Sequence, residues 1–232
     1  MKTNILNTIA AAAVFSFTLF GCTTASESTL DESVTAVTPV SEGEMIDEQA
    51  EFMTRFEAET RSAGLAPAEA GTYENMFSDV ANTADYTFLE LAKKSSELST
   101  FVELLDEADM ITALEEYTGR SFTIFAPTNA AFDAMPAGML EELRKPEHRN
   151  QLIRLLQAHM LVEPVAAAQF TDNQQIQFGH TLYIPVKVSD DGSRQVNVGG
   201  ATIVKPDVNA SNGVIHVVDA VVQPVNPYKE AK

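Results

Sequence analysis

Cysteine and basic residues are scarce in this chain of 232 residues, and long apolar runs are missing. A single cysteine excludes an intramolecular disulfide and every zinc site built from several cysteines. Lys and Arg number 15 against 33 Asp and Glu, and the resulting charge of −18 opposes binding to nucleic acid, which is itself a polyanion. No apolar run reaches the roughly 20 residues that a permanent membrane-spanning helix needs.

Motifs of catalysis are absent as well. The chain contains no glycine-rich dinucleotide loop, no phosphate loop, no Gly-x-Ser-x-Gly turn and no His-Glu-x-x-His pair. Asp190-Asp191-Gly192 lacks the further regularly spaced oxygens of a calcium loop, so a plain turn is the simpler interpretation. We therefore expect no catalytic residue, no bound metal and no cofactor.

The amino terminus has the composition of an export signal. Residues 1–21 begin with Lys2 and continue in an uncharged apolar stretch, as in a secretory signal peptide. Leu19–Cys22 resembles the lipobox of bacterial lipoproteins, which implies that Cys22 carries a lipid. Thr23 stands where an Asp would indicate retention in the inner membrane, so the resemblance implies a lipid-anchored protein of the bacterial cell envelope, at the outer membrane. The alternative is an ordinary exported protein with an incidental cysteine.

Composition divides the rest of the chain into four parts. Residues 22–41 are rich in Ser, Thr and acidic residues and hold no basic or aromatic residue, which predicts a disordered tether. An apolar stripe behind a capping box predicts an amphipathic accessory helix at 42–62, within a segment 42–84 that also contains a linker. The globular domain is expected at 85–226, and 227–232 forms a C-terminal tail. With 45% hydrophobic residues and 13 Phe, the chain can fill a core.

Within the domain, apolar residues recur first at helical spacing and then at strand spacing. Helical spacing predicts helices that begin at 88–92, at 101–111 and after Pro146. Pro127-Thr128-Asn129 predicts the end of a strand and the cap of a short helix through Phe132. Strand spacing predicts strands at 122–126, 182–188 and 214–222. The last run is almost continuously apolar, which favours burial on both faces in the middle of the sheet. Asp191-Gly192 predicts a hairpin turn. Helices followed by strands indicate an α+β fold.

Three segments of this domain carry a family resemblance. Residues 122–132, FTIFAPTNAAF, resemble the first signature of the fasciclin domain family, and 212–219, NGVIHVVD, resemble the second. Between them, 155–161 matches the central Tyr-His element in His159, with Ala158 in the Tyr position. The matching signature residues are Phe125, Pro127, Thr128, Asn129, Phe132, His159, Asn212, Gly213, His216 and Asp219.

The resemblance covers about 85–226 and implies a fasciclin-like fold, a twisted β-wedge with a helical layer. It also implies extracellular adhesion without catalysis. Independently of the family, Asn212-Gly213 suits a type I′ turn, because both residues tolerate positive φ. His159 and His216 have apolar neighbours, which favours core imidazoles hydrogen-bonded to the backbone over ligands.

One stretch before the second signature is a candidate for interaction. Lys205, Pro206, Asp207 and Val208 lie where some animal members of the family carry a Glu-Pro-Asp-Ile-type motif implicated in integrin binding. The alternative is a turn that positions the next strand.

These features predict a non-enzymatic adhesion or extracellular interaction module, attached to the membrane through its N-terminal lipid. Its expected partner is an envelope or extracellular protein or glycan, and nucleic acid is excluded. The alternative is a periplasmic protein that binds a small ligand or a polysaccharide in a pocket between the helices and the wedge. A hydrolase with a dispersed site is disfavoured by the missing motifs.

Overall fold

The computed structural model describes residues 73–116, 121–179 and 182–225. The chain divides into two units, Met1–Val40 and Ser41–Lys232, and every described residue belongs to the second.

Several expected features lie outside the described residues and stay predictions. They are the signal peptide 1–21, Cys22 with the tether 22–41, the accessory helix at 42–62 and the tail 227–232.

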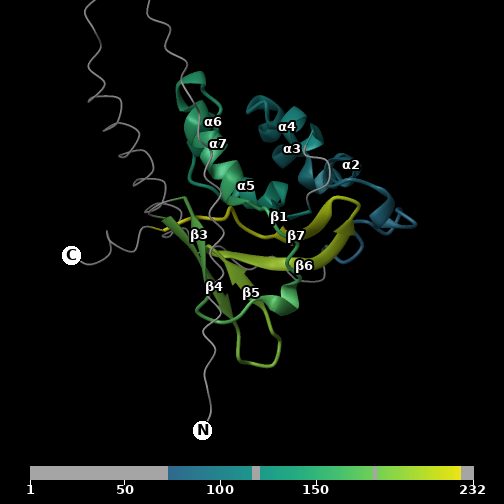
Figure 1. The fold of residues 1–232 in the computed structure, drawn as a ribbon. Coiled ribbons are helices and arrows are strands. Elements are labelled where there is room, and N and C mark those ends of the chain that lie inside the picture. The colour runs from purple at the N-terminus through teal and green to yellow at the C-terminus, as the bar shows by residue number, and fades with distance from the viewer. Residues whose placement is uncertain (1–72, 117–120, 180–181, 226–232) are drawn as a thin grey trace, which may run out of the picture. The chain divides into compact units, whose positions relative to one another are not determined.

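Helices dominate the first half of the described chain and strands the second, as the sequence predicted (Figure 1). The α-helices are α2 (Phe88–Lys94), α3 (Ser99–Glu107), α4 (Met110–Glu116), α5 (Asn129–Asp133), α6 (Met139–Leu143) and α7 (Arg149–Ala158). The 3₁₀ turns are η1 (Thr83–Asp85), η2 (Ser96–Leu98), η3 (Pro146–His148) and η4 (Ala167–Gln169). The strands are β1 (Phe122–Pro127), β2 (Met160–Leu161), β3 (Gln175–Phe178), β4 (Leu182–Val188), β5 (Val196–Val198), β6 (Ala201–Ala210) and β7 (Gly213–Val218).

The described strands form one seven-stranded sheet in the order β2-β1-β7-β6-β5-β4-β3. β1 and β7 run parallel, with Ile124 opposite Ile215, and all other neighbouring strands run antiparallel. Helices α2 to α7 lie on one side of β1 and β7, as Figure 1 shows. The domain is therefore α+β, which confirms the predicted class.

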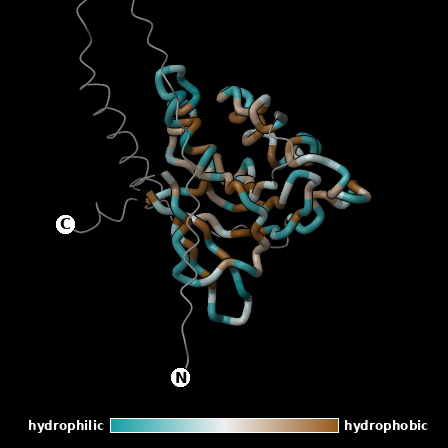
Figure 2. Tube along the Cα trace, in the orientation of Figure 1, coloured by the Kyte–Doolittle hydropathy of each residue, from teal (hydrophilic) through white to brown (hydrophobic). Residues whose placement is uncertain are grey.

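Two apolar cores lie on opposite faces of β1 and β7. Ile124, Ile215 and Val217 belong to the first core, together with residues of the helices. Phe125 and Val218 belong to the second core, which β4, β5 and β6 complete. Successive residues of a strand face opposite sides, so both strands are buried on both faces, as the apolar run predicted for β7. Figure 2 shows hydrophobic residues concentrated where strands and helices meet.

The candidate interaction stretch is a β-bulge inside β6. The pairing of β6 with β7 shifts between Ile203 and Lys205, and again between Lys205 and Val208. Asp207 has φ +55°, in the left-handed region that residues other than glycine rarely adopt. Residues 205–208, which we call the bulge, therefore interrupt a long strand and do not form the turn considered above.

Two local predictions were wrong, and a third was right except for the length of a turn. The helix expected over 101–111 is broken at Asp109, whose φ is +53°, so that α3 ends before it and α4 begins after it. β4 and β5 form the hairpin expected around Asp191-Gly192, but their connection spans 189–195 and is longer than a two-residue turn. The strand expected to reach residue 222 ends at Val218.

The packed domain begins upstream of residue 85. Tyr73 and Phe77 are buried, and Phe77 is part of the first core. The Lys205 ammonium also donates to the Glu74 carbonyl oxygen at 2.6 Å, across 131 residues of sequence. Residues from 73 onward, expected to belong to a linker, thus pack against the domain.

Candidate functional site

The Asn212-Gly213 signature joins three elements at the start of β7. The Asn212 side-chain oxygen accepts the backbone N–H of Phe88 at 2.8 Å, which satisfies the first N–H of α2. The Asn212 carbonyl oxygen accepts the backbone N–H of Phe122 at 3.0 Å. This one residue therefore connects α2, β1 and the β6–β7 turn.

Glycine is required at 213 because β1 approaches too closely for a side chain. A Cβ on Gly213 would lie 2.0 Å from the Phe122 carbonyl oxygen. The connecting residues between β6 and β7 are Ser211 and Asn212, and Gly213 is the first residue of the strand. Asn212 does not have the positive φ of a type I′ turn, so that interpretation was wrong.

The first signature forms the corner between β1 and α5. Thr128 is the N-cap of α5: its hydroxyl oxygen accepts the Ala131 N–H at 3.2 Å. Asn129 then ties α5 to the chain at the start of α3, because its Oδ1 accepts the Thr100 N–H at 3.0 Å and its Nδ2 donates to the Ser96 carbonyl oxygen at 2.8 Å. The predicted cap is confirmed, and the Asn129 bonds show why an amide follows it.

The other members of the first signature are buried. Pro127 ends β1, Phe132 fills the first core and Phe125 fills the second. All three residues therefore build the fold.

His159 is fully buried at the C-terminal end of α7. Its Nε2 accepts the Val222 N–H at 2.9 Å, so its proton sits on Nδ1, which donates to the Leu155 carbonyl oxygen at 2.7 Å. Burial lowers the pKa of His159 to about 4, against the opposing effect of the Leu155 carbonyl. The ring is neutral at neutral pH, and its two hydrogen bonds connect the chain after β7 to α7. Ala158, in the Tyr position, is buried beside it.

His216 is buried on β7 as the opposite tautomer. Its Nδ1 accepts the Asp207 N–H at 3.1 Å, so Nε2 donates to the Val165 carbonyl oxygen at 2.8 Å. The rings of Phe125 and Phe170 pack against it, with centroids at 5.7 and 5.9 Å. Burial lowers the pKa of His216, while the Val165 carbonyl and the Asp207 carboxylate act in the opposite direction. Backbone partners for both core histidines confirm that prediction.

Asp219 closes the second signature by holding the end of β7 to β6. Its Oδ1 accepts the Thr202 N–H at 2.7 Å, and its own N–H donates to the Thr202 carbonyl oxygen at 3.1 Å. Burial raises the pKa of this half-buried carboxyl, and the hydrogen bonds from Thr202 oppose that shift.

Only part of the bulge faces solvent. Pro206 and Asp207 are exposed, Val208 is buried in the first core, and Lys205 is half-buried against Glu74. The Asp207 side chain is 45% exposed, yet its Oδ1 accepts the Ala167 N–H at 2.8 Å. Asp207 therefore links two segments of the fold and is also exposed. Its truncation would disturb the fold as well as the surface.

Two residues that the sequence analysis did not single out hold the segment 163–170, which we call the strap. The Thr123 hydroxyl accepts the Val165 N–H and donates to the Glu163 carbonyl oxygen, both at 2.7 Å. The Arg194 guanidinium donates to the Ala168 carbonyl oxygen at 2.6 Å. A hydroxyl inside an apolar strand was a signal for Thr123, whereas nothing in the sequence pointed to Arg194.

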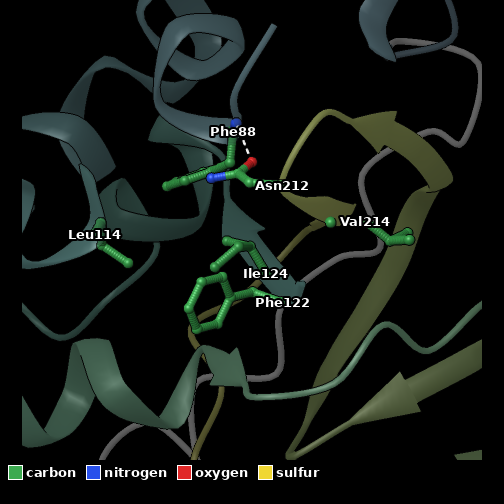
Figure 3. Close-up of a pocket in the computed structure, with 7 residues that line it drawn as sticks. Phe88, Leu114, Phe122, Ile124, Asn212 and Val214 are labelled. Atoms are coloured by element: carbon green, nitrogen blue, oxygen red, sulfur yellow. Dashed lines mark hydrogen bonds between the residues drawn. The ribbon is translucent and has the colours of Figure 1, made fainter. Parts of the chain in front are cut away.

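A pocket opens beside the Asn212 junction (Figure 3). Its lining residues are Phe88, Leu114, Phe122, Ile124, Asn212, Gly213 and Val214. The volume of about 220 Å³ includes space open to solvent, whereas ligand pockets enclose roughly 300–1,000 Å³. The Asn212 oxygen is already engaged by Phe88, as the dashed line in Figure 3 shows. This pocket gives little support to a small-ligand function.

The described residues contain neither a cluster of metal-binding side chains nor a membrane-spanning helix. Within residues 73–116, 121–179 and 182–225, no group of three or more His, Cys, Asp or Glu could hold a metal ion. In the same part of the chain, no helix combines the length and apolarity needed to cross a bilayer.

The domain combines a seven-stranded sheet with a layer of helices. Its signature residues form hydrogen bonds within the domain or fill its cores, and so maintain the fold. The chain belongs to the fasciclin domain family, since the family model for the fasciclin domain matches residues 96–224.

Relatives extend this match. Protein sll1483 of Synechocystis sp. is 36% identical over 173 residues, which cover 74% of this chain and 92% of that protein. The cell surface glycolipoprotein MPB83 of Mycobacterium bovis is 27% identical over 218 residues, 92% of each chain. A solved FAS1 domain pair from the insect cell adhesion molecule fasciclin I matches 52% of this chain and 40% of that chain, at 22% identity and a TM-score of 0.34.

Proposed function

We propose that this protein is a non-enzymatic adhesion or interaction module of the bacterial cell envelope, anchored by a lipid on Cys22. Its membership of the fasciclin domain family carries the proposal. The similarity to a mycobacterial protein named a cell surface glycolipoprotein, over 92% of both chains, supports the envelope location.

The hydrogen bonds of the signature residues support a role without catalysis. His159 and His216 use both ring nitrogens on backbone groups, and Asn212 and Asn129 bond backbone N–H groups with their side-chain oxygens. A general acid or base needs a nitrogen or oxygen free to meet its substrate. These four residues serve the fold instead.

The lipid anchor rests on the lipobox at Leu19–Cys22 and is tested by substitution of the acceptor. We expect Cys22→Ser to move the protein from the detergent-extracted membrane fraction to the soluble fraction, because anchoring free energy comes from buried acyl methylenes, about 0.8 kcal/mol each. Thr24→Ser, which makes an equally small change two residues away, should stay in the membrane fraction. Equal membrane retention of both variants would contradict the anchor.

The exposed part of the bulge is the surface that we assign to the partner. Pro206 and Asp207 are exposed, and β6 pairs with β7 before and after them, which fixes their place on the domain surface. The chain is acidic, with 33 acidic and 15 basic residues, and exposed like charges repel across about 10 Å at 0.1 M salt. A protein or a neutral glycan therefore fits as partner, and an anionic polymer would require bridging divalent cations.

Adhesion of cells that display the full chain tests this assignment. We expect Pro206→Ser and Asp207→Asn to weaken adhesion severalfold at unchanged melting temperature, since the asparagine oxygen still accepts the Ala167 N–H. Asn209→Ala, an exposed change on the same strand, is the matched control and should adhere like the parent. Unchanged adhesion in all three variants would contradict the bulge as contact surface. Strong binding to a polyanion in the presence of a chelator would contradict the electrostatic argument.

A further inference from the structure

The strap and the bulge meet at His216. The strap forms hydrogen bonds with Thr123 from β1, Arg194 from the β4–β5 connection and His216 from β7. The bulge forms a further hydrogen bond to the strap, because the Asp207 carboxylate accepts the Ala167 N–H at 2.8 Å. His216 thus contacts the strap with one ring nitrogen and the bulge with the other.

The neutral ring fits this arrangement because each nitrogen has a partner of the complementary kind. Nδ1 is an acceptor for the Asp207 N–H, and Nε2 is a donor to the Val165 carbonyl. A protonated ring carries a hydrogen on both nitrogens, so Nδ1–H would point at the Asp207 N–H. The Asp207 Oδ1 lies 4.0 Å from Nδ1, close enough to become the new acceptor after a shift of roughly 1 Å.

We propose that protonation of His216 switches the bulge and the strap between two arrangements. In the neutral arrangement, the Asp207 carboxylate holds Ala167 and the Asp207 N–H holds the ring. In the acid arrangement, the carboxylate turns to the imidazolium Nδ1–H and releases the Ala167 N–H, while the Asp207 N–H turns away. Asp207 has a left-handed backbone conformation inside the irregular pairing of β6 with β7, which makes the bulge the segment that gives way.

The Asp207 carboxylate favours a charged His216 ring, whereas the Arg194 cation on the strap opposes one. Asp207 from β6 is the carboxylate that faces the ring, and Arg194 reaches the strap at the Phe170 carbonyl, next to the ring contact of Phe170. The groups that pack on the ring from β1 and from the strap are the uncharged rings of Phe125 and Phe170. Burial keeps the pKa of His216 below its ordinary value, so the switch operates on the acid side of pH 6.5.

Two exposed parts of the surface change together in this switch. Pro206 and Asp207 belong to the bulge, and Val162, 60% exposed, directly precedes the strap. The switch depends on these contacts and not on the proposed adhesion.

Nuclear magnetic resonance of the full chain tests the switch from pH 7.5 to pH 4.5. We expect the His216 ring to titrate below pH 6.5, and the Ala167 amide to exchange about tenfold faster over the same midpoint, after correction for the pH dependence of exchange itself. The Val222 amide is the internal control: its acceptor is His159, whose pKa of about 4 keeps it protected through that midpoint. Constant protection of Ala167 while His216 titrates would overturn the proposal, as would a ring that titrates only when the whole domain unfolds.

Two matched carboxylate variants separate the switch from general acid sensitivity. Asp207→Asn keeps the acceptor for Ala167 and tolerates the left-handed backbone, but it removes the charge that the imidazolium would meet. In this variant the midpoint of the His216 titration should therefore move down by at least half a pH unit, with protection of the Ala167 amide unchanged at pH 7.5. Asp172→Asn also alters a carboxylate that accepts a backbone N–H, that of Val188, and should leave the midpoint in place. Equal midpoints for the two variants would overturn the proposal.

Discussion

Replacing Gly213 by alanine tests the close approach of β1 and β7 directly. The added Cβ would lie 2.0 Å from the Phe122 carbonyl oxygen, 2.7 Å from its nitrogen and 2.8 Å from its carbonyl carbon. Ordinary contacts begin at 3.4 Å, so the backbone of β1 must retreat by more than 1 Å. That movement would strain the bond from the Phe122 N–H to the Asn212 carbonyl and lift the Phe122 ring from the first core.

The expected cost has two parts. Forcing extra volume into a packed site costs typically 1–3 kcal/mol. Placing a side chain at φ +149° adds about 1–2 kcal/mol of backbone strain. We therefore expect Gly213→Ala to lower the free energy of unfolding by about 2–5 kcal/mol, measured by urea denaturation.

Gly200→Ala is the matched control, because Gly200 also has positive φ, +88°, but no atom lies within 4 Å of its ideal Cβ. It carries the backbone strain without the clash, so its loss should stay near 1–2 kcal/mol. Equal losses in the two variants would refute the argument that β1 excludes a side chain at position 213.

Three further predictions concern the same core. In the folded state the buried His159 ring has a pKa of about 4, whereas an unfolded histidine protonates near pH 6.5. The contribution of His159 to the free energy of unfolding is therefore full above pH 6.5 and falls by about 3 kcal/mol toward pH 4. In pH-dependent urea unfolding, His159→Gln should lose that part of the slope and Leu155→Ala should keep it. Ile215→Ala should cost about 2–5 kcal/mol in the same assay, and an unchanged midpoint would mean that the core is misplaced. Asn212→Ala should cost about 1 kcal/mol, while Asn212→Asp, which retains the acceptor for Phe88, should cost less.

Features set by neighbouring residues were predictable from the sequence. The apolar run of β7 follows from burial on two faces, and the Thr128 cap is recognised from a Pro-Thr-Asn sequence that follows a strand. His159 and His216 were recognised as core residues because their neighbours are apolar. In each case the relevant pattern lies within a few residues of the position itself.

Features set by distant partners were not predictable. The break at Asp109 places its carboxylate beside Arg149, 40 residues later, while helical spacing continues across the break. The bulge at Asp207 depends on His216 and Ala167, which belong to other elements. The Asn212-Gly213 pair suggested a turn from local propensity, but its geometry is decided by Phe88 and Phe122. No local pattern contains these contacts.

The parallel pairing of β1 with β7 also determines when the domain can fold. Phe122 lies opposite Gly213, about 90 residues further along the chain, and the two strands separate the two cores. Closing so long a loop is entropically costly before contacts form, which slows folding. A chain that ends before residue 213 lacks one of the two strands that contribute to both cores and should have no stable partial fold. A polypeptide emerging from a ribosome, or threading through a pore, would thus stay unfolded until its last strand has arrived.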